Sequence, residues 1–299
     1  MTAEEVTEGL DLSGKTFVIT GVNSGLGLET MRVLTLRGAH VIGAARPLEK
    51  ATEACASVAG KTTPVACELS DLASVKACAD TILALDIPVD VVICNAGIMA
   101  LPELRVKDGL ELQFLTNHMG HFLLIYRLQA ALLAAQSGRI VLLSSLGHKM
   151  TVKGGIDFSN LDGAKGYHDW KFYGQSKLAN LLTAVAFNQR WSKQGVCANA
   201  VHPGVIATNL SRELKGPMGK AMESPLFKKL FDAMAFTKSI PQGASTQCFV
   251  ATSPALEGEG GGYYADNAKA TPSAHGTRQR LADQLWDYSV DYLQGYLED

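Results

Sequence analysis

The sequence has no long apolar run, no excess of positive charge and no paired cysteine motif. No stretch reaches the roughly 18 consecutive apolar residues that a membrane-spanning helix needs. The 27 Lys and Arg residues face 29 Asp and Glu residues, so the broad attraction that nucleic acid or an anionic membrane requires is missing. The six cysteines form no CxxC pair and no zinc-type grouping with histidine, so we expect no metal site.

The composition indicates a soluble globular protein. Residues 1–14, MTAEEVTEGLDLSG, are polar and acidic, unlike an export signal or a membrane anchor. We therefore expect a cytoplasmic protein with reduced cysteines. Hydrophobic residues make up 47% of the 299 positions, which is enough for a full core and excludes intrinsic disorder.

Short apolar segments alternate with segments of helical spacing along most of the chain. The expected strands cover residues 15–20, 40–45, 63–68, 89–94, 139–144, 197–201 and 262–265. The expected helices cover residues 26–37, 48–59, 71–85, 108–135, 172–193, 242–251 and 277–292. This pattern predicts a single α/β domain, doubly wound, with a mostly parallel seven-stranded sheet and helices on both faces. We expect residues 1–12 to be a tail and residues 208–236 to pass over the carboxyl edge of the sheet.

A glycine-rich turn follows the first expected strand directly and leads into a helix. Glycine lets the backbone approach a pyrophosphate, and the start of a helix supplies unpaired N–H groups. The spacing is T-G-x3-G-x-G rather than G-x-G-x-x-G, but its place after the first strand favours a dinucleotide site over a structural turn. The expected binding residues here are Gly21, Asn23, Ser24, Gly25, Leu26 and Gly27.

The end of the second expected strand bears on which dinucleotide binds. An acidic residue there usually holds a free ribose 2′-hydroxyl, whereas a 2′-phosphate needs positive charge. The chain has Ala44, Ala45 and Arg46 at this point. The guanidinium group of Arg46 can donate two hydrogen bonds to such a phosphate. The alternative is that Arg46 is only a surface residue at the start of a helix. We expect NADP(H) to be preferred over NAD(H).

Tyr173 and Lys177 form a Y-x-x-x-K pair, which places both on one face of a helix. A nearby ammonium favours the phenolate and lowers the pKa of a tyrosine from about 10. Such a phenol can donate a proton to a carbonyl oxygen as hydride arrives, or accept one in the reverse reaction. The chain has eight tyrosines, so this spacing also arises by chance and is not decisive alone.

Ser144 and Ser145 end the fifth expected strand, where open α/β sheets bind their ligands. A hydroxyl there can hold a substrate oxygen, although strand-terminal serines also satisfy backbone groups. The surrounding LLSSL lacks the G-x-S-x-G of a serine hydrolase. Asn117 lies inside an expected helix, where asparagine favours a local break. Such a break can free a backbone carbonyl to bind water, and that water can link Lys177 to solvent.

Together TGVNSGLG, NAG, Asn117, Ser145, YGQSK and HPGVIAT, in this order, resemble the short-chain dehydrogenase/reductase family, which has a Rossmann-type fold. The resemblance covers about residues 13–265 and is strongest to the retinol-dehydrogenase and carbonyl-reductase-like branch. It implies a catalytic tetrad of Asn117, Ser145, Tyr173 and Lys177. It further implies cofactor contacts from Arg46, Glu68, Leu69, Asn95, Ala96, Gly97, Tyr173, Lys177, Pro203, Gly204, Ile206 and Thr208.

The chain departs from the family pattern at two points. Glu68-Leu69 stands where relatives usually have Asp-Leu in contact with adenine. Ser145 and Tyr173 are 28 positions apart, about twice the common spacing in the family. The resulting insert, residues 146–172, resembles that of carbonyl reductases and retinol dehydrogenases. It can cover the surface that many relatives use to form tetramers, so we expect a monomer or a homodimer.

Residues 208–236 are rich in Leu, Met and Phe and are expected to roof the site together with the insert. We therefore expect a hydrophobic or aromatic ketone or aldehyde and its alcohol as substrates, unless these side chains only pack on the body. Two other functions stay open. Protochlorophyllide reductases share the GLGLxT and NHxGHF patterns, which allows NADPH-dependent C=C reduction. A non-catalytic dinucleotide-sensing protein is disfavoured because all four catalytic positions are filled.

Overall fold

The computed structural model describes residues 1–206 and 237–297, and these form an α/β fold. The main sheet of this part of the chain has eight strands in the order β12-β11-β8-β7-β4-β1-β2-β3. Their bounds are β1 Thr16–Thr20, β2 His40–Ala45, β3 Thr62–Ala66, β4 Val91–Cys94, β7 Gly138–Leu143, β8 Val196–His202, β11 Tyr263–Ala265 and β12 Ala268–Lys269. All pairings are parallel except that of β11 with β12. The predicted doubly wound fold is confirmed, with β12 as an added edge strand.

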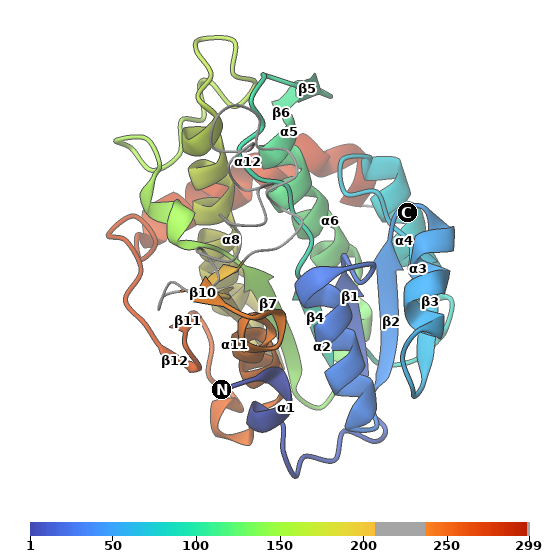
Figure 1. Ribbon diagram of the computed structural model, residues 1–299. Helices are drawn as coiled ribbons and strands as arrows, with labels where there is room; N and C mark the ends of the chain where they lie inside the picture. Colours follow the sequence, from blue (N-terminus) through green and yellow to red (C-terminus); the bar gives the residue numbers. More distant parts are fainter. Residues whose placement is uncertain (207–236, 298–299) are drawn as a thin grey trace, which may run out of the picture.

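Helices cover both faces of the sheet (Figure 1). One core layer contains α1 Ala3–Val6, α2 Gly25–Leu36, α3 Leu48–Ala56 and α11 Ile240–Thr252. The other contains α4 Leu72–Leu83, α6 Gly120–Arg127, α8 Asp169–Trp191 and α12 Gln279–Leu297. Strand β1 contributes side chains to both layers. Val18 packs in the layer of α4, α6, α8 and α12, whereas Phe17 and Ile19 pack in the layer of α1, α2, α3 and α11. Burying each such side chain contributes about 1.5–3 kcal/mol.

The helix expected over residues 108–135 is broken into shorter pieces. Strands β5 Val106–Lys107 and β6 Leu110–Glu111 form a hairpin, with Asp108 and Gly109 at φ 52° and 80°. An Asp-Gly pair is typical of this tight turn, and it delays the helix until α5 Leu112–Phe114. A π-helical turn, Leu115–Met119, then precedes α6, and α7 Gln129–Leu133 follows. The local break expected at Asn117 is confirmed, since the π turn contains it.

Two other expectations concern the chain outside the central sheet. Residues 1–12, expected as a tail, contain helix α1, and Ala3 is completely buried against the core that includes α11. This segment is therefore packed. The passage expected at residues 208–236 lies outside the described residues.

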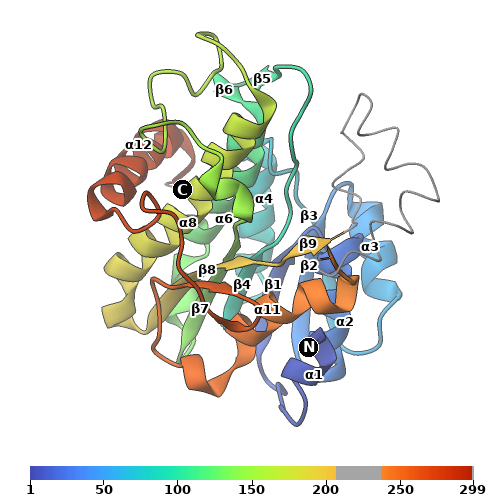
Figure 2. The ribbon, with the colours of Figure 1, turned by 60° about the vertical axis from the view of Figure 1, so that its left-hand side comes forward.

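The parallel arrangement brings the functional segments to one edge. The carboxyl ends of β1, β4, β7 and β8 lie side by side because these strands are neighbours in the sheet (Figure 2). The short parallel pair β9 Val205–Ile206 and β10 Thr237–Lys238 follows β8 at this edge. Among the described residues, every helix is too short or too polar to cross a bilayer.

Candidate active site

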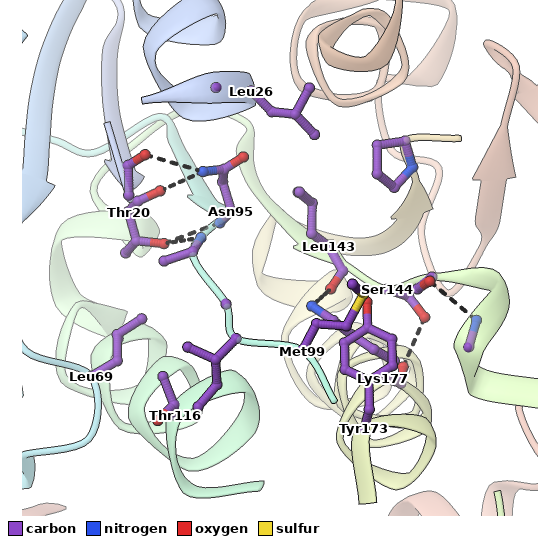
Figure 3. Close-up of a pocket in the computed structure, with 18 of the residues that line it drawn as sticks. Thr20, Leu26, Leu69, Asn95, Met99, Thr116, Leu143, Ser144, Tyr173 and Lys177 are labelled. Carbon is purple, nitrogen blue, oxygen red and sulfur yellow. Dashed lines mark hydrogen bonds between the residues drawn. The ribbon is translucent and has the colours of Figure 1, made fainter. Parts of the chain in front are cut away.

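A pocket of about 720 Å³ opens at the carboxyl edge of the sheet (Figure 3). Most residues implied by the family resemblance line it: Gly21, Asn23, Ser24, Gly25, Leu26, Arg46, Glu68, Leu69, Asn95, Ala96, Gly97, Ser145, Tyr173, Lys177, Pro203, Gly204 and Ile206. Gly27 and Asn117 are not part of the lining. Thr208 lies outside the described residues.

The glycine-rich turn is built for close approach. Gly21 and Gly25 have φ values of 74° and 57°, a region that favours glycine. A Cβ at Gly27 would collide with the carbonyl oxygen of Gly21 and stand 2.5 Å from Asn95 Nδ2, so Gly27 lets α2 pack tightly on the turn. The side chain of Ser24 makes no capping hydrogen bond. The first N–H groups of α2 therefore lack a cap from this side chain, and the helix begins at the pocket wall with Gly25 and Leu26.

Thr20 and Asn95 tie this turn to the end of β4. The Thr20 hydroxyl accepts hydrogen bonds from the backbone N–H groups of Asn95 and Ala96, both at 3.0 Å. The Asn95 amide donates to the Thr20 carbonyl at 2.8 Å (Figure 3). Next along the chain, a Cβ at Gly97 would lie 3.3 Å from Lys177 Nζ. Small residues here therefore bring the strand end against Lys177.

At the far end of the pocket, Arg46 forms an ion pair with Glu68. The Glu68 carboxylate also accepts from the Ser70 backbone N–H at 3.0 Å and from its hydroxyl at 2.7 Å. Burial favours the neutral acid, but the hydrogen bonds from Arg46 and Ser70 outweigh it and lower the pKa of Glu68. Arg46, the cation expected to hold the 2′-phosphate, is thus paired with a carboxylate, and this ion pair was not predicted from the sequence.

Three members of the implied tetrad gather from two elements. Tyr173 and Lys177 lie on α8 and are 5% and 4% exposed. Lys177 Nζ is 5.7 Å from the centre of the Tyr173 ring and donates to the Leu143 carbonyl at 3.1 Å (Figure 3). The Asn117 amide, from the π turn, donates to Ser176 Oγ on the same helix at 2.9 Å. Helix α8 thus supports the tetrad.

The two serines at the end of β7 have different partners. Ser144 Oγ donates to the carbonyl oxygen of Lys177 at 2.7 Å (Figure 3). Ser145 Oγ accepts from the Gly147 N–H at 3.1 Å, and its interaction with Tyr173 acts to lower the pKa of that phenol. Ser145 is the serine beside the phenol, as the resemblance implies, and Ser144 holds the backbone of α8.

Burial shifts the pKa values of Tyr173 and Lys177 in opposite directions. Loss of solvent raises the pKa of Tyr173 to about 12, opposed by the interaction with Ser145. Loss of solvent also lowers the pKa of Lys177 to about 8, opposed by the field of Cys94. The lowering of the phenol pKa that we expected from Lys177 stays a prediction, and desolvation of the phenolate acts against it.

An apolar wall lies beside Tyr173, and three of its residues belong to the insert, residues 146–172, that was expected to roof the site. Its pocket-lining side chains are Ile98, Met99, Leu146, Met150 and Trp170. The Trp170 ring meets that of Tyr173 edge to face at 6.0 Å. The signals for this wall in the sequence were the position of Met99 just after the Asn-Ala-Gly turn and the three-residue spacing of Trp170 from Tyr173.

Two buried polar atoms at the pocket make no hydrogen bond within the described chain. They are Thr116 Oγ1 and His202 Nδ1, and both residues line the pocket. Buried polar atoms in native proteins nearly always have partners. Both atoms are buried within the pocket wall rather than exposed at its surface.

Comparison with known proteins agrees with this geometry. The family model for short chain dehydrogenase matches residues 15–218. The chain is 41% identical to the short-chain dehydrogenase TIC 32 B, chloroplastic, of Brassica napus, over 97% of this chain and 92% of that protein. It is 37% identical to the human WW domain-containing oxidoreductase, over 98% of this chain and 71% of that protein. A crystal structure of an uncharacterized protein from Mycobacterium Paratuberculosis superposes with a TM-score of 0.77 at 30% identity, covering 97% of each chain.

Both the matching relatives and the Rossmann-like fold lead to one assignment. The chain belongs to the short-chain dehydrogenase family, whose members are oxidoreductases that use a nicotinamide dinucleotide.

Proposed function

We propose that this protein interconverts a hydrophobic or aromatic ketone or aldehyde and its alcohol, with NADP(H) as the hydride carrier. The observation that carries the proposal is the meeting of Ser145, Tyr173 and Lys177 in the pocket that also contains the start of α2. An acid, a cation and an anion-binding helix end within one cavity match what hydride transfer to a carbonyl requires.

The residues present fit NADP(H). The N–H groups at the start of α2 suit the pyrophosphate, and Arg46 suits the 2′-phosphate beside Glu68 and Leu69. We assign Asn95, Ala96, Gly97, Tyr173 and Lys177 to the nicotinamide side, and Pro203, Gly204, Ile206 and Thr208 to its carboxamide. The bound cofactor supplies or takes up the hydride.

The proton chemistry follows from the tetrad. In reduction, the Ser145 hydroxyl donates a hydrogen bond to the carbonyl oxygen, and the Tyr173 phenol gives its proton to that oxygen as hydride reaches the carbon. With a pKa of about 12 the phenol is protonated at neutral pH, which suits an acid. The Lys177 ammonium stabilises the phenolate that remains.

We assign to Asn117 a part in returning a proton from solvent to Tyr173 after the reaction. Its backbone carbonyl oxygen lies 2.9 Å from His121 Nδ1, and a carbonyl oxygen has a second lone pair. We assign that lone pair to a water that links Lys177 to solvent. The Asn117 side chain holds the Ile98 backbone N–H and carbonyl at 2.8 and 2.9 Å.

The apolar wall of Met99, Met150 and Trp170 supports the substrate class. Methionine adapts to irregular apolar shapes, and an indole presents a flat apolar surface. We further propose a monomer or homodimer, because the insert of residues 146–172 can cover the surface that many relatives use to form tetramers. We also propose a reducing compartment such as the cytoplasm, because the described cysteines are all buried and free.

The test is a panel of aryl ketones, aliphatic aldehydes and sugars, followed by loss of reduced-nicotinamide absorbance with NADPH or NADH. We expect the fastest turnover with aryl or other hydrophobic carbonyls and NADPH. Faster turnover of sugars would contradict the substrate class. Reduction of protochlorophyllide but of no carbonyl would indicate a C=C reductase, and NADPH binding without any turnover would indicate a sensor.

A further inference from the structure

Two completely buried histidines border the tetrad and take no part in the chemistry above. His121 lies in α6, one helical turn after Asn117, and His148 lies in a 3-10 turn, Leu146–Lys149, just after Ser145. Each ring bonds through Nδ1 to the backbone of a tetrad residue and through Nε2 to a distant element. This shared arrangement links the tetrad to the rest of the fold.

The tautomer of His121 follows from its neighbours. Its Nε2 lies 2.8 Å from the Thr20 hydroxyl, which already accepts two backbone hydrogen bonds, from Asn95 and Ala96. A hydroxyl has two acceptor sites and one proton, so Thr20 donates that proton to Nε2. The His121 proton is therefore on Nδ1, which donates to the Asn117 carbonyl at 2.9 Å.

The same deduction holds for His148. The backbone N–H of Ser273 donates to its Nε2 at 2.9 Å, so Nε2 carries no proton. Nδ1 then carries the proton and donates to the carbonyl of Ser145 at 2.6 Å. The ring also meets Tyr263 edge to face at 5.2 Å. His148 thus joins the loop of the tetrad serine to the segment around Ser273.

Both rings are neutral in this arrangement. Burial lowers the pKa of His121 to about 4, and burial also lowers that of His148, in each case against the opposing effect of the bond to the tetrad carbonyl. His118 provides a contrast. It is equally buried and close to His121 in sequence, but its partners are Ser289 Oγ at 3.1 Å and Thr183 Oγ1 at 3.3 Å. Both of these partners are hydroxyl groups, whereas the rings of His121 and His148 each bond to a tetrad carbonyl.

We propose that His121 and His148 are positioning residues that hold the backbone carbonyls of Asn117 and Ser145 through neutral Nδ1–H imidazoles. This inference rests on the proposed function, because it assigns the two rings to the same tetrad. His121 ties the π turn to the end of β1, and His148 ties Ser145 to the segment around Ser273. Small displacements of catalytic groups lower rates strongly, so the bonds matter for turnover more than for binding.

Replacement by asparagine or by glutamine distinguishes the hydrogen bond at Nδ1 of each imidazole from the one at Nε2. Asparagine places an amide N–H near the Nδ1 position and keeps the bond to the tetrad carbonyl, whereas glutamine reaches only the Nε2 position. We expect His148→Asn and His121→Asn to keep kcat within about threefold, and His148→Gln and His121→Gln to lower it about tenfold or more. The Kd for NADPH should change less than about twofold. His118→Gln, the matched control, should lower Tm and leave kcat unchanged.

Equal kcat for the Asn and Gln variants, or an equal loss in His118→Gln, would overturn the assignment. A second measurement needs no variant: nitrogen-15 NMR of the histidine rings in the wild-type protein at pH 7. We expect Nδ1–H tautomers for both rings, and an Nε2–H tautomer or an imidazolium at either position would contradict the proposal. Absence of carbonyl turnover in the wild type would instead count against the proposed function. The NMR measurement would still show whether Nδ1 of each histidine carries the proton, as this inference requires.

Discussion

Lys177 Nζ lies 5.7 Å from the centre of the Tyr173 ring and is fixed by a 3.1 Å hydrogen bond to the carbonyl of Leu143. The two residues are four positions apart on α8, which puts them on one face of the helix. Leu143 ends β7, so the ammonium is held between helix and sheet. Because both side chains are buried, the lysine titrates near neutral pH and the phenol does not.

This difference predicts the pH dependence of reduction. Burial lowers the pKa of Lys177 to about 8, so the ammonium is present below that pH and lost above it. The kcat/KM for the carbonyl should be flat between about pH 6 and 7 and should fall toward a tenfold loss per pH unit above pH 8. The Kd for NADPH at each pH separates this effect from cofactor binding. A rate that rises through pH 8 would be inconsistent with the ammonium as the active form.

The ion pair of Arg46 and Glu68 predicts how the cofactor is selected. Arg46→Ala should lower kcat/KM with NADPH by about 10- to 100-fold, because a charge-assisted hydrogen bond to the 2′-phosphate is lost. NADH should be affected less than about threefold. Glu68→Gln removes the carboxylate that competes for Arg46, so NADPH should bind more tightly, most clearly at low salt. An equal loss with both cofactors in Arg46→Ala would remove this residue from cofactor selection.

The two adjacent serines make a matched pair. Ser145→Ala should lower kcat about 10²-fold or more, since the hydroxyl beside the Tyr173 phenol is removed. Ser144→Ala should keep kcat within about fivefold and lower the free energy of unfolding by about 1 kcal/mol, because it removes one buried hydrogen bond to α8. Steady-state kinetics and denaturant unfolding measure the two effects. The opposite pattern would exchange the roles assigned to the serines.

The glycine at the start of α2 predicts a packing effect. In Gly27→Ala the new methyl group meets the Gly21 carbonyl and Asn95, so the free energy of unfolding should fall by about 1–3 kcal/mol and NADPH should bind more weakly. Gly295→Ala is the control, because Gly295 lies exposed in α12 with open space around it. That variant should gain about 0.5–1 kcal/mol from helix propensity. A Gly27→Ala protein as stable as the wild type would refute the close packing.

Much of the fold was predictable because its signals are local. The first strand, expected at residues 15–20, is observed at Thr16–Thr20, since an apolar run between polar residues determines a buried parallel strand. The break at Asn117 was also predictable from the poor fit of asparagine inside a helix. The hairpin turn at Asp108-Gly109 carried an equally local signal, but the helical spacing that follows obscured it.

The remaining features depend on contacts between distant parts of the chain. Arg46 was expected beside the cofactor, but its pairing with Glu68 requires β2 and the end of β3 to be neighbours. The raised pKa of Tyr173 follows from burial by surrounding elements, which the Y-x-x-x-K spacing does not encode. His148 was not singled out at all, because its partner Ser273 is 125 positions away.

Tyr173→Phe removes the phenol that we propose as the proton donor and keeps the aromatic ring. The measurement compares kcat for reduction of a hydrophobic ketone by NADPH with the Kd for NADPH, in the variant and the wild type. We expect kcat to fall about 10²-fold or more, while the Kd stays within about twofold. A Tyr173→Phe protein that binds NADPH normally and reduces the ketone at the wild-type rate would contradict it.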